Sequence, residues 1–245
     1  MPASTPDHRR TGVRSAADER GIEASASHEL VASWNEALGL FRTHRLLELG
    51  RTRPGPRPLG RAAATKERIV EAAAELFDAR GFRAVSADKI IERAGITKIT
   101  FYRHFPSKDD LIVSYLQRRS AWERTAILAA SDEAGGDADT TLRLMCEGIG
   151  REACSPGFRG CPFVNAAAEY TDAVHPVREV VAAHRTWYLT MLNKLTALMG
   201  IRDPAVADEL MMLRDGAMVA GYLGDAEKVG AALLSASRAA VGHDR

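Results

Sequence analysis

The stretch from Ser86 to Pro106 is the feature that most constrains the fold of this chain. Ser86 and Thr97 are each typical N-caps of a short helix, because their hydroxyls can accept a hydrogen bond from a backbone N–H of the first turn. Gly95 lies between the two helices, where the chain reverses in a conformation that a side chain opposes. Pro106 ends the second helix. Two short helices joined by a tight glycine turn predict a helix-turn-helix, whose second helix enters the major groove of DNA.

The second helix of this pair has one face for the core and one for solvent. Phe101 and Phe105 lie four residues apart and can both face inward. The polar side chains Lys98, Thr100, Arg103 and His104 are then left on the outer faces, with Thr97 at the exposed N-terminal end.

The rest of the chain after residue 60 also has helical patterning, which predicts an all-α protein with about nine helices after Thr65. Thr65 is the expected N-cap of the first of these, and Gly81 the expected end. Ser107 and Asp110 have the spacing of a capping box, opening a helix that runs to about Ala130. The apolar stripe expected on that helix consists of Leu111, Ile112, Tyr115, Leu116 and Trp122. The later helices are expected at 139–153, 162–170, 176–200, 203–223 and 225–241.

Charge is unevenly distributed along the chain. The net charge is +1, but residues 51–120 carry +7, residues 121–245 carry −5 and residues 1–50 carry −1. A basic block followed by an acidic one favours a polyanionic partner for the first.

Several classes of protein are excluded by composition. No apolar run approaches the roughly 20 residues of a membrane helix, and the polar N-terminus lacks the apolar core of a signal peptide, so a cytoplasmic protein is expected. Cys146, Cys154 and Cys161 are too few for a disulfide framework and contain no CxxC pair. With His184 far downstream, we expect reduced thiols, no metal site and no cofactor.

Residues 1–62 differ from the rest and are expected to be an extension and linker, largely disordered, with a possible short helix over 30–41. The segment 51–60 contains three prolines and two glycines, as linkers do. Its arginines Arg51, Arg53 and Arg57 belong either to an arm that enters the minor groove or to a solvated linker. The whole extension is either a functional arm or poorly constrained sequence.

A family resemblance rests on motifs spread over residues 63–123. The motifs are the helix that begins at Thr65, the Gly81-Phe pair, the turn from Ala94 to Thr97, and the run Phe101-Tyr-Arg-His-Phe-Pro-Ser-Lys108. They resemble the DNA-binding domain of the tetracycline-repressor (TetR/AcrR) family. The resemblance implies a helix-turn-helix domain over 63–123, with its motif at 86–105. It also implies a larger helical domain over 124–245 for effector binding and dimerisation.

The resemblance further implies which residues touch DNA. Thr97, Lys98, Thr100 and Arg103 are candidates for base-edge or adjacent phosphate contacts, and Ser86, Tyr102, His104 and Lys108 for backbone phosphates. The alternative for Ser86 and Thr97 is that they only cap helices, and for Tyr102 that it only packs. Ile99 stands where members of the family usually have a small residue. It either contacts a thymine methyl group or is tucked into a local packing contact.

A pocket for a small effector is expected in the C-terminal part, where aromatic rings and a few polar groups occur together. The candidates are Trp122, Phe158, Phe163, Asn165, Glu169, Tyr170, His184, Trp187 and Tyr188. The alternative is that these side chains are ordinary core residues at helical spacing.

The function implied by the resemblance is that of a homodimeric repressor, not an enzyme. A small molecule would release it from a palindromic double-stranded operator. The last two helices, over about 203–241, are expected to form the dimer through a four-helix bundle. Three alternatives remain: a thiol-based redox regulator using Cys154 and Cys161, a small hydrolase using Cys161 or His184, and an adaptor with a vestigial helix-turn-helix.

Overall fold

The computed structural model describes residues 60–242, and all regular structure within that range is helical, as expected. The predictions made for residues 1–59, including the helix over 30–41 and the arginine-bearing linker, lie outside the described residues. The elements are α2 (Arg61–Arg80), α3 (Ala87–Ala94), α4 (Lys98–His104), α5 (Lys108–Glu133), α6 (Ala138–Ala153), α7 (Pro162–Glu169), α8 (Pro176–Leu198), α9 (Pro204–Leu223), the short 3-10 helix η2 (Ala226–Lys228) and α10 (Val229–Gly242).

Local capping explains why the short helices begin and end where the sequence predicts. The Ser86 side chain accepts from the Lys89 N–H at the start of α3, and Thr97 caps α4. Gly95 ends α3 with a φ of 62°, in the left-handed region that favours glycine. Both hydrogen bonds of the predicted capping box between Ser107 and Asp110 are formed at the start of α5.

The starts of two helices differ from the expectation by about one turn. Thr65 is not an N-cap: α2 begins one turn earlier at Arg61, after Gly60, and the Thr65 hydroxyl donates to the Arg61 carbonyl. The residues before Thr65 are alanines, which extend a helix without a capping side chain. The last helix begins at Val229 instead of 225, because Asp225 caps η2 first.

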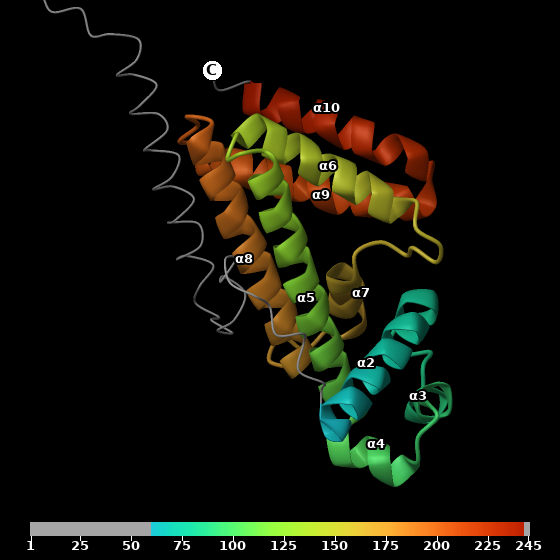
Figure 1. Ribbon diagram of the computed structural model, residues 1–245. Helices are drawn as coiled ribbons and strands as arrows, with labels where there is room; N and C mark the ends of the chain where they lie inside the picture. Colours follow the sequence, from blue (N-terminus) through green and yellow to red (C-terminus); the bar gives the residue numbers. More distant parts are fainter. Residues whose placement is uncertain (1–59, 243–245) are drawn as a thin grey trace, which may run out of the picture. The chain divides into compact units, whose positions relative to one another are not determined.

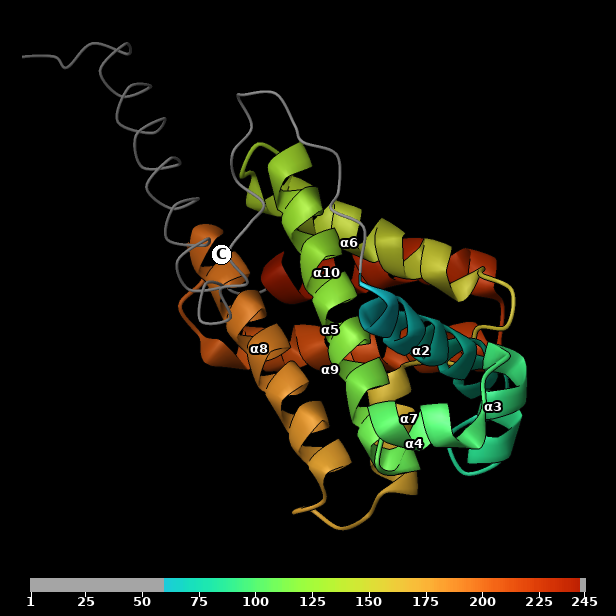
Figure 2. The same cartoon turned by 60° about the horizontal axis from the view of Figure 1, so that its bottom comes forward.

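The helices form two groups that share α5 (Figures 1 and 2). We call residues 61–107, which contain α2, α3 and α4, the reading head. It lies around the N-terminal end of α5, and its core contains Phe77, Phe82 and Phe101 with Leu111 of α5. We call residues 124–242 the body, in which α8 lies along α5, and α6, α9 and α10 pack together and against that pair.

Helix α5 joins the reading head to the body without a break. The expected boundary between 123 and 124 therefore falls inside a helix that runs to Glu133. Leu111, Ile112 and Leu116 are buried on α5 as predicted, but Trp122 is 52% exposed and does not continue their stripe. Within residues 60–242, no helix combines the length and the apolar character needed to cross a membrane.

Candidate functional site

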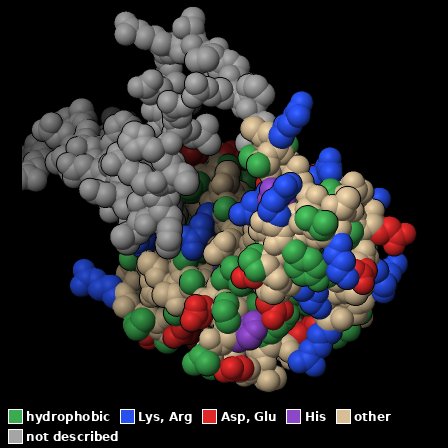
Figure 3. Space-filling view, turned by 90° about the horizontal axis from the view of Figure 1, so that it is seen from below, with side chains coloured by type: hydrophobic (Ala, Val, Ile, Leu, Met, Phe, Trp, Pro, Cys, Tyr) green, Lys and Arg blue, Asp and Glu red, His purple; other side chains and the backbone are tan. Residues whose placement is uncertain are grey.

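The outer face of α4 presents a mixed basic and apolar surface. Phe101 is fully buried and fixes the helix to the reading head, so the residues beside it point outward. Ile99 is 82% exposed and Tyr102 is 44% exposed, and Lys98 and Arg103 are also exposed. Figure 3, which looks at this end of the described region, shows Lys and Arg side chains bordering exposed hydrophobic ones. Ile99 is therefore not tucked into a packing contact, which leaves it free to meet a ligand on this face.

The hydroxyls predicted at this face are engaged as helix caps. Thr97 Oγ1 accepts from the Thr100 N–H at 3.2 Å and lies 2.9 Å from Thr100 Oγ1. Ser86 Oγ accepts from the Lys89 N–H at 3.3 Å. All of these bonds are exposed. A capping hydroxyl that accepts from its helix keeps its own hydrogen to donate, and in the Thr97–Thr100 pair one of the two hydroxyl hydrogens stays free. Capping and contact with an anion are therefore compatible at these positions.

Two of the side chains predicted to contact phosphates are only partly exposed in the structure. The Lys108 ammonium group donates to the carbonyls of Phe82 and Val85 at 3.0 and 3.1 Å, so two of its three hydrogens hold the α2–α3 connection. His104 is only partly exposed, and its Nε2 is buried without a hydrogen-bond partner among the described residues. We therefore place Tyr102 and Arg103 ahead of Lys108 and His104 as outward contacts.

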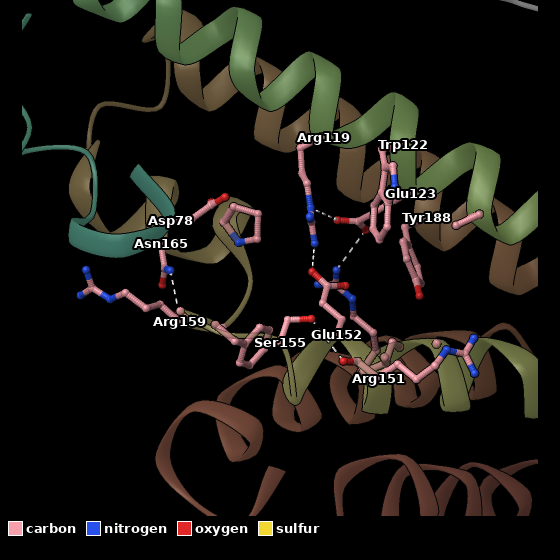
Figure 4. Close-up of a pocket in the computed structure, with 18 of the residues that line it drawn as sticks. Asp78, Arg119, Trp122, Glu123, Arg151, Glu152, Ser155, Arg159, Asn165 and Tyr188 are labelled. Carbon is pink, nitrogen blue, oxygen red and sulfur yellow. Dashed lines mark hydrogen bonds and ion pairs between the residues drawn. The ribbon is translucent and has the colours of Figure 1, made fainter. Parts of the chain in front are cut away.

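A cavity of about 740 Å³ lies between the reading head and the body (Figure 4). It is lined from α2 and the α2–α3 connection by Asp78, Gly81 and Phe82, and from α5 by Arg119, Trp122 and Glu123. The remaining lining comes mainly from α6, the segment before α7, and α7, with Tyr188 of α8 and Arg214 of α9. A volume of this size is within the range of small-molecule sites.

Four charged groups of the cavity wall are paired with one another: Arg119, Glu123, Glu152 and Arg214. Arg119 lies between Glu123 and Glu152 and forms an ion pair with each (Figure 4). Arg214, only 6% exposed, donates to Glu123 Oε2 at 3.2 Å, to Asp215 at 3.2 Å and to Cys161 Sγ at 3.0 Å. The Arg214 guanidinium also lies 5.1 Å from the Tyr188 ring centre. The most buried charges of the cavity wall, those of Glu123 and Arg214, are thus paired.

Glu123 and His184 form the buried end of this network. Burial opposes ionisation of Glu123, but contact with His184 and the charge of Arg214 outweigh it and hold the pKa of Glu123 below its ordinary value. Burial lowers the pKa of His184, and Glu123 offsets this only in part. His184 Nδ1 lies 3.0 Å from Ser120 Oγ, and its Nε2 lies 3.4 Å from Glu123 Oε2. At neutral pH the network is a neutral imidazole beside a carboxylate and a guanidinium.

The structure brings some of the predicted pocket residues to the cavity and not others. Trp122, Phe158, Asn165, Glu169 and Tyr188 line it. The other four candidates, Phe163, Tyr170, His184 and Trp187, are not among the lining residues. Phe163 is buried and stacks on His184 with ring centres 3.6 Å apart, and the Tyr170 hydroxyl donates to Asp109 at 2.7 Å. These contacts match the alternative expectation of ordinary packing.

The charged lining residues Arg119, Glu152 and Arg214 were not predicted. They come from α5, α6 and α9, and no local spacing connects those helices. Arg119 and Glu123 do lie four apart on α5, which was a usable signal for that one pair.

The thiols give no support to the alternatives that rest on them. All three cysteines are free, with Cys146 and Cys161 buried and Cys154 exposed. Within the described residues, the hydrogen-bond partner of Cys161 Sγ is Arg214, while His184 is engaged by Ser120. Residues 60–242 contain no cluster of three or more His, Cys, Asp or Glu side chains that could hold a metal ion.

Comparison with known proteins identifies the reading head. Residues 69–115 match the model of the bacterial regulatory proteins of the tetR family. The crystal structure of SCO4454, a TetR-family transcriptional regulator from Streptomyces coelicolor, is similar to this chain with a TM-score of 0.70 and 40% identity. The match covers 74% of this chain and 95% of that one, so it includes the body as well as the reading head.

Two curated relatives extend the similarity. The HTH-type transcriptional regulator LmrA of Bacillus subtilis (strain 168) is 28% identical over 137 residues, which are 54% of this chain and 71% of the relative. The HTH-type transcriptional repressor DrrR1 of Streptomyces coeruleorubidus is 26% identical over 212 residues, covering 85% and 69% of the two chains. The motif residues of α3 and α4, the helical body behind them and these relatives agree: the chain belongs to the TetR family of helix-turn-helix transcriptional regulators.

Proposed function

We propose that the protein is a homodimeric repressor that leaves a palindromic operator when a small molecule occupies its cavity. The proposal that the protein binds DNA rests on the outer face of α4, where Ile99, Tyr102 and Arg103 are exposed beside the buried Phe101. DrrR1 is named a repressor, which supports the direction of regulation. As a regulator of bacterial operators, the protein is expected to act in the cytoplasm.

The proposed roles follow from the chemistry of each side chain. Arg103 and Lys98 donate to base edges or phosphates, and Ile99 covers a thymine methyl group. Tyr102 donates its hydroxyl to a phosphate. Residues 63–123 form the DNA-binding part and residues 124–245 the part for effector binding and dimerisation, with α5 common to both.

The dimer is proposed to form through α9 and α10. Met212, Val219, Tyr222 and Leu223 of α9 are between 47% and 75% exposed. Apolar side chains gathered on one helix favour burial against a partner, and two such helix pairs make a four-helix bundle. A two-fold dimer would place two α4 helices in successive major grooves, roughly 34–36 Å apart.

The effector is proposed to be a largely uncharged molecule. The cavity wall has aromatic and apolar side chains beside charged ones, and its most buried charges, Arg214 and Glu123, are already paired. A charged ligand would have to compete with those pairs, whereas a neutral one that both donates and accepts hydrogen bonds would not. Binding would shift α5, and with it the spacing of the two α4 helices, by an amount set by the effector's differential affinity for the two states.

Selection of duplexes from random DNA by the intact protein, followed by gel shift, tests the proposal. We expect a two-fold symmetric site and an affinity that falls steeply as salt concentration rises, since phosphate contacts release counterions. An absence of any enriched sequence would contradict the proposal, and binding independent of salt would favour an adaptor.

A further inference from the structure

The segment between α2 and α3 is held by hydrogen bonds to one carboxylate of the body. Glu169, the last residue of α7, accepts from the Phe82 N–H at 3.1 Å through Oε1 and from the Arg83 N–H at 2.6 Å through Oε2. The Arg83 guanidinium returns a hydrogen bond to the Glu169 carbonyl at 2.5 Å. Hydrogen bonds from N–H groups to an ionised carboxylate are stronger than those between neutral groups. One body residue thus clamps the backbone between two helices of the reading head.

The shape of the chain at Gly81 shows how close this contact is. Gly81 has a φ of 78°, and a Cβ built there would lie 3.0 Å from Glu169 Oε1. Any other residue at this position would be strained and would crowd the carboxylate. The other side of the same connection is held by Lys108, which donates to the Phe82 and Val85 carbonyls. The connection is therefore fixed between α5 on one side and α7 on the other.

The same carboxylate belongs to the cavity wall. Glu169 and Gly81 both line the cavity, as do Phe82 and Arg159, whose guanidinium donates to the Ala79 carbonyl at 3.2 Å. An occupant at this end of the cavity that offers a hydrogen-bond donor would compete with the Phe82 and Arg83 N–H groups for Glu169. Hydrogen bonding of Glu169 to an occupant of the cavity therefore competes with its hydrogen bonding to the Phe82–Arg83 backbone.

We propose that Glu169 transmits occupancy of the cavity to the reading head. With the clamp closed, α3 and α4 are held in the orientation that binds DNA. An occupant that draws Glu169 away frees the Phe82–Arg83 backbone, so that the reading head can move relative to the body. This inference rests on the proposed function, and it makes Glu169 a positioning residue: it touches no DNA and acts through α3 and α4.

The first test removes the charge while keeping the shape. In Glu169→Gln one oxygen remains to accept, and the new NH2 group faces an N–H donor. We expect hydrogen exchange of the peptide containing Phe82 and Arg83 to accelerate by about tenfold or more. Affinity for a duplex selected by the wild-type protein should fall by about tenfold, with far-UV circular dichroism unchanged. Glu179→Gln, the same change at an exposed residue of α8, is the matched control and should alter neither measurement.

The second test supplies an artificial occupant. Ala168, exposed and lining the cavity next to Glu169, is changed to Cys in a Cys154→Ser background and labelled with N-(4-hydroxyphenyl)maleimide, whose phenol hydroxyl can donate a hydrogen bond; Cys146 and Cys161 are buried. Labelling should weaken DNA binding when Glu169 is present and add little in the Glu169→Gln variant. Equal losses in the two backgrounds, or wild-type DNA affinity in Glu169→Gln, would overturn the inference. A wild-type protein that selects no duplex would instead contradict the proposed function, and the exchange measurement would still decide whether the clamp exists.

Discussion

Arg103 on α4 and Arg214 in the cavity wall lie in opposite environments, one exposed to solvent and the other buried. Arg103 is exposed and forms no hydrogen bond or ion pair with a described residue, and Ile99 beside it is 82% exposed. Arg214 is 6% exposed and contacts Glu123, Cys161 and Asp215. The guanidinium that we propose to contact DNA has no partner among the described residues, whereas the one in the cavity wall is neutralised by neighbouring side chains. The difference predicts which substitutions change stability and which change binding alone.

The largest effect is expected from Arg214→Met. The change leaves the Glu123 carboxylate buried without its main cationic partner, and breaking a buried pair in this way costs about 3–5 kcal/mol. Urea unfolding at fixed protein concentration measures the loss. The double variant with Glu123→Gln should recover part of it. A loss below about 1 kcal/mol would mean that Arg214 is not a structural residue of the cavity.

Arg103→Ala should have the converse effect. We expect the free energy of unfolding to stay within about 0.5 kcal/mol, because the side chain is exposed. Operator affinity should weaken by about 1–3 kcal/mol, as for loss of one base-edge contact. Fluorescence anisotropy with the selected duplex and with unrelated DNA separates the loss of a base-edge contact from the loss of a phosphate contact. Equal weakening on both DNAs would make Arg103 a phosphate contact instead.

A smaller effect is expected from pH through His184. Its folded-state pKa is lowered by burial, so below the unfolded value of about 6.5 the unfolded chain binds more protons than the native one. Stability contributed by the neutral imidazole is therefore present above that value and lost as the pH falls. The thermal midpoint should drop between about pH 7.5 and pH 5.5, and His184→Gln should flatten the drop. An unchanged slope in the variant would assign the pH dependence to other groups.

Ile99→Ala is expected to change the free energy of unfolding as little as Arg103→Ala does, within about 0.5 kcal/mol. The same variant tests direct reading of DNA. If Ile99 covers a thymine methyl group, replacing that thymine by uracil should weaken wild-type binding but not binding by the variant. A variant as sensitive to the uracil substitution as the wild-type protein would remove Ile99 from the DNA contact.

The sequence predicted best what is determined by near neighbours along the chain. Ser86, Gly95 and the Ser107 capping box act within four residues of themselves, so α3, α4 and the start of α5 were located from them. The start of α2 was missed because no side chain caps it. The cavity was predicted only in part, since its wall brings together residues as distant in sequence as Asp78 of α2 and Arg214 of α9. Glu169 was predicted as a pocket residue, but its hydrogen bonds from the Phe82 and Arg83 N–H groups depend on how α7 packs against the reading head.

The exposure of Ile99 and Tyr102 has a consequence for the temperature dependence of operator binding. In the free protein both side chains hold apolar surface in water next to charged groups. If complex formation covers that surface, the heat capacity of the system falls, which is the robust sign of apolar burial. The binding enthalpy would then become more negative as temperature rises, with an entropy change that opposes it. Titration calorimetry at several temperatures should therefore give a binding enthalpy that changes less steeply with temperature for Ile99→Ala than for the wild-type protein. The difference between the two slopes measures the contribution of this one exposed isoleucine to the heat capacity of binding.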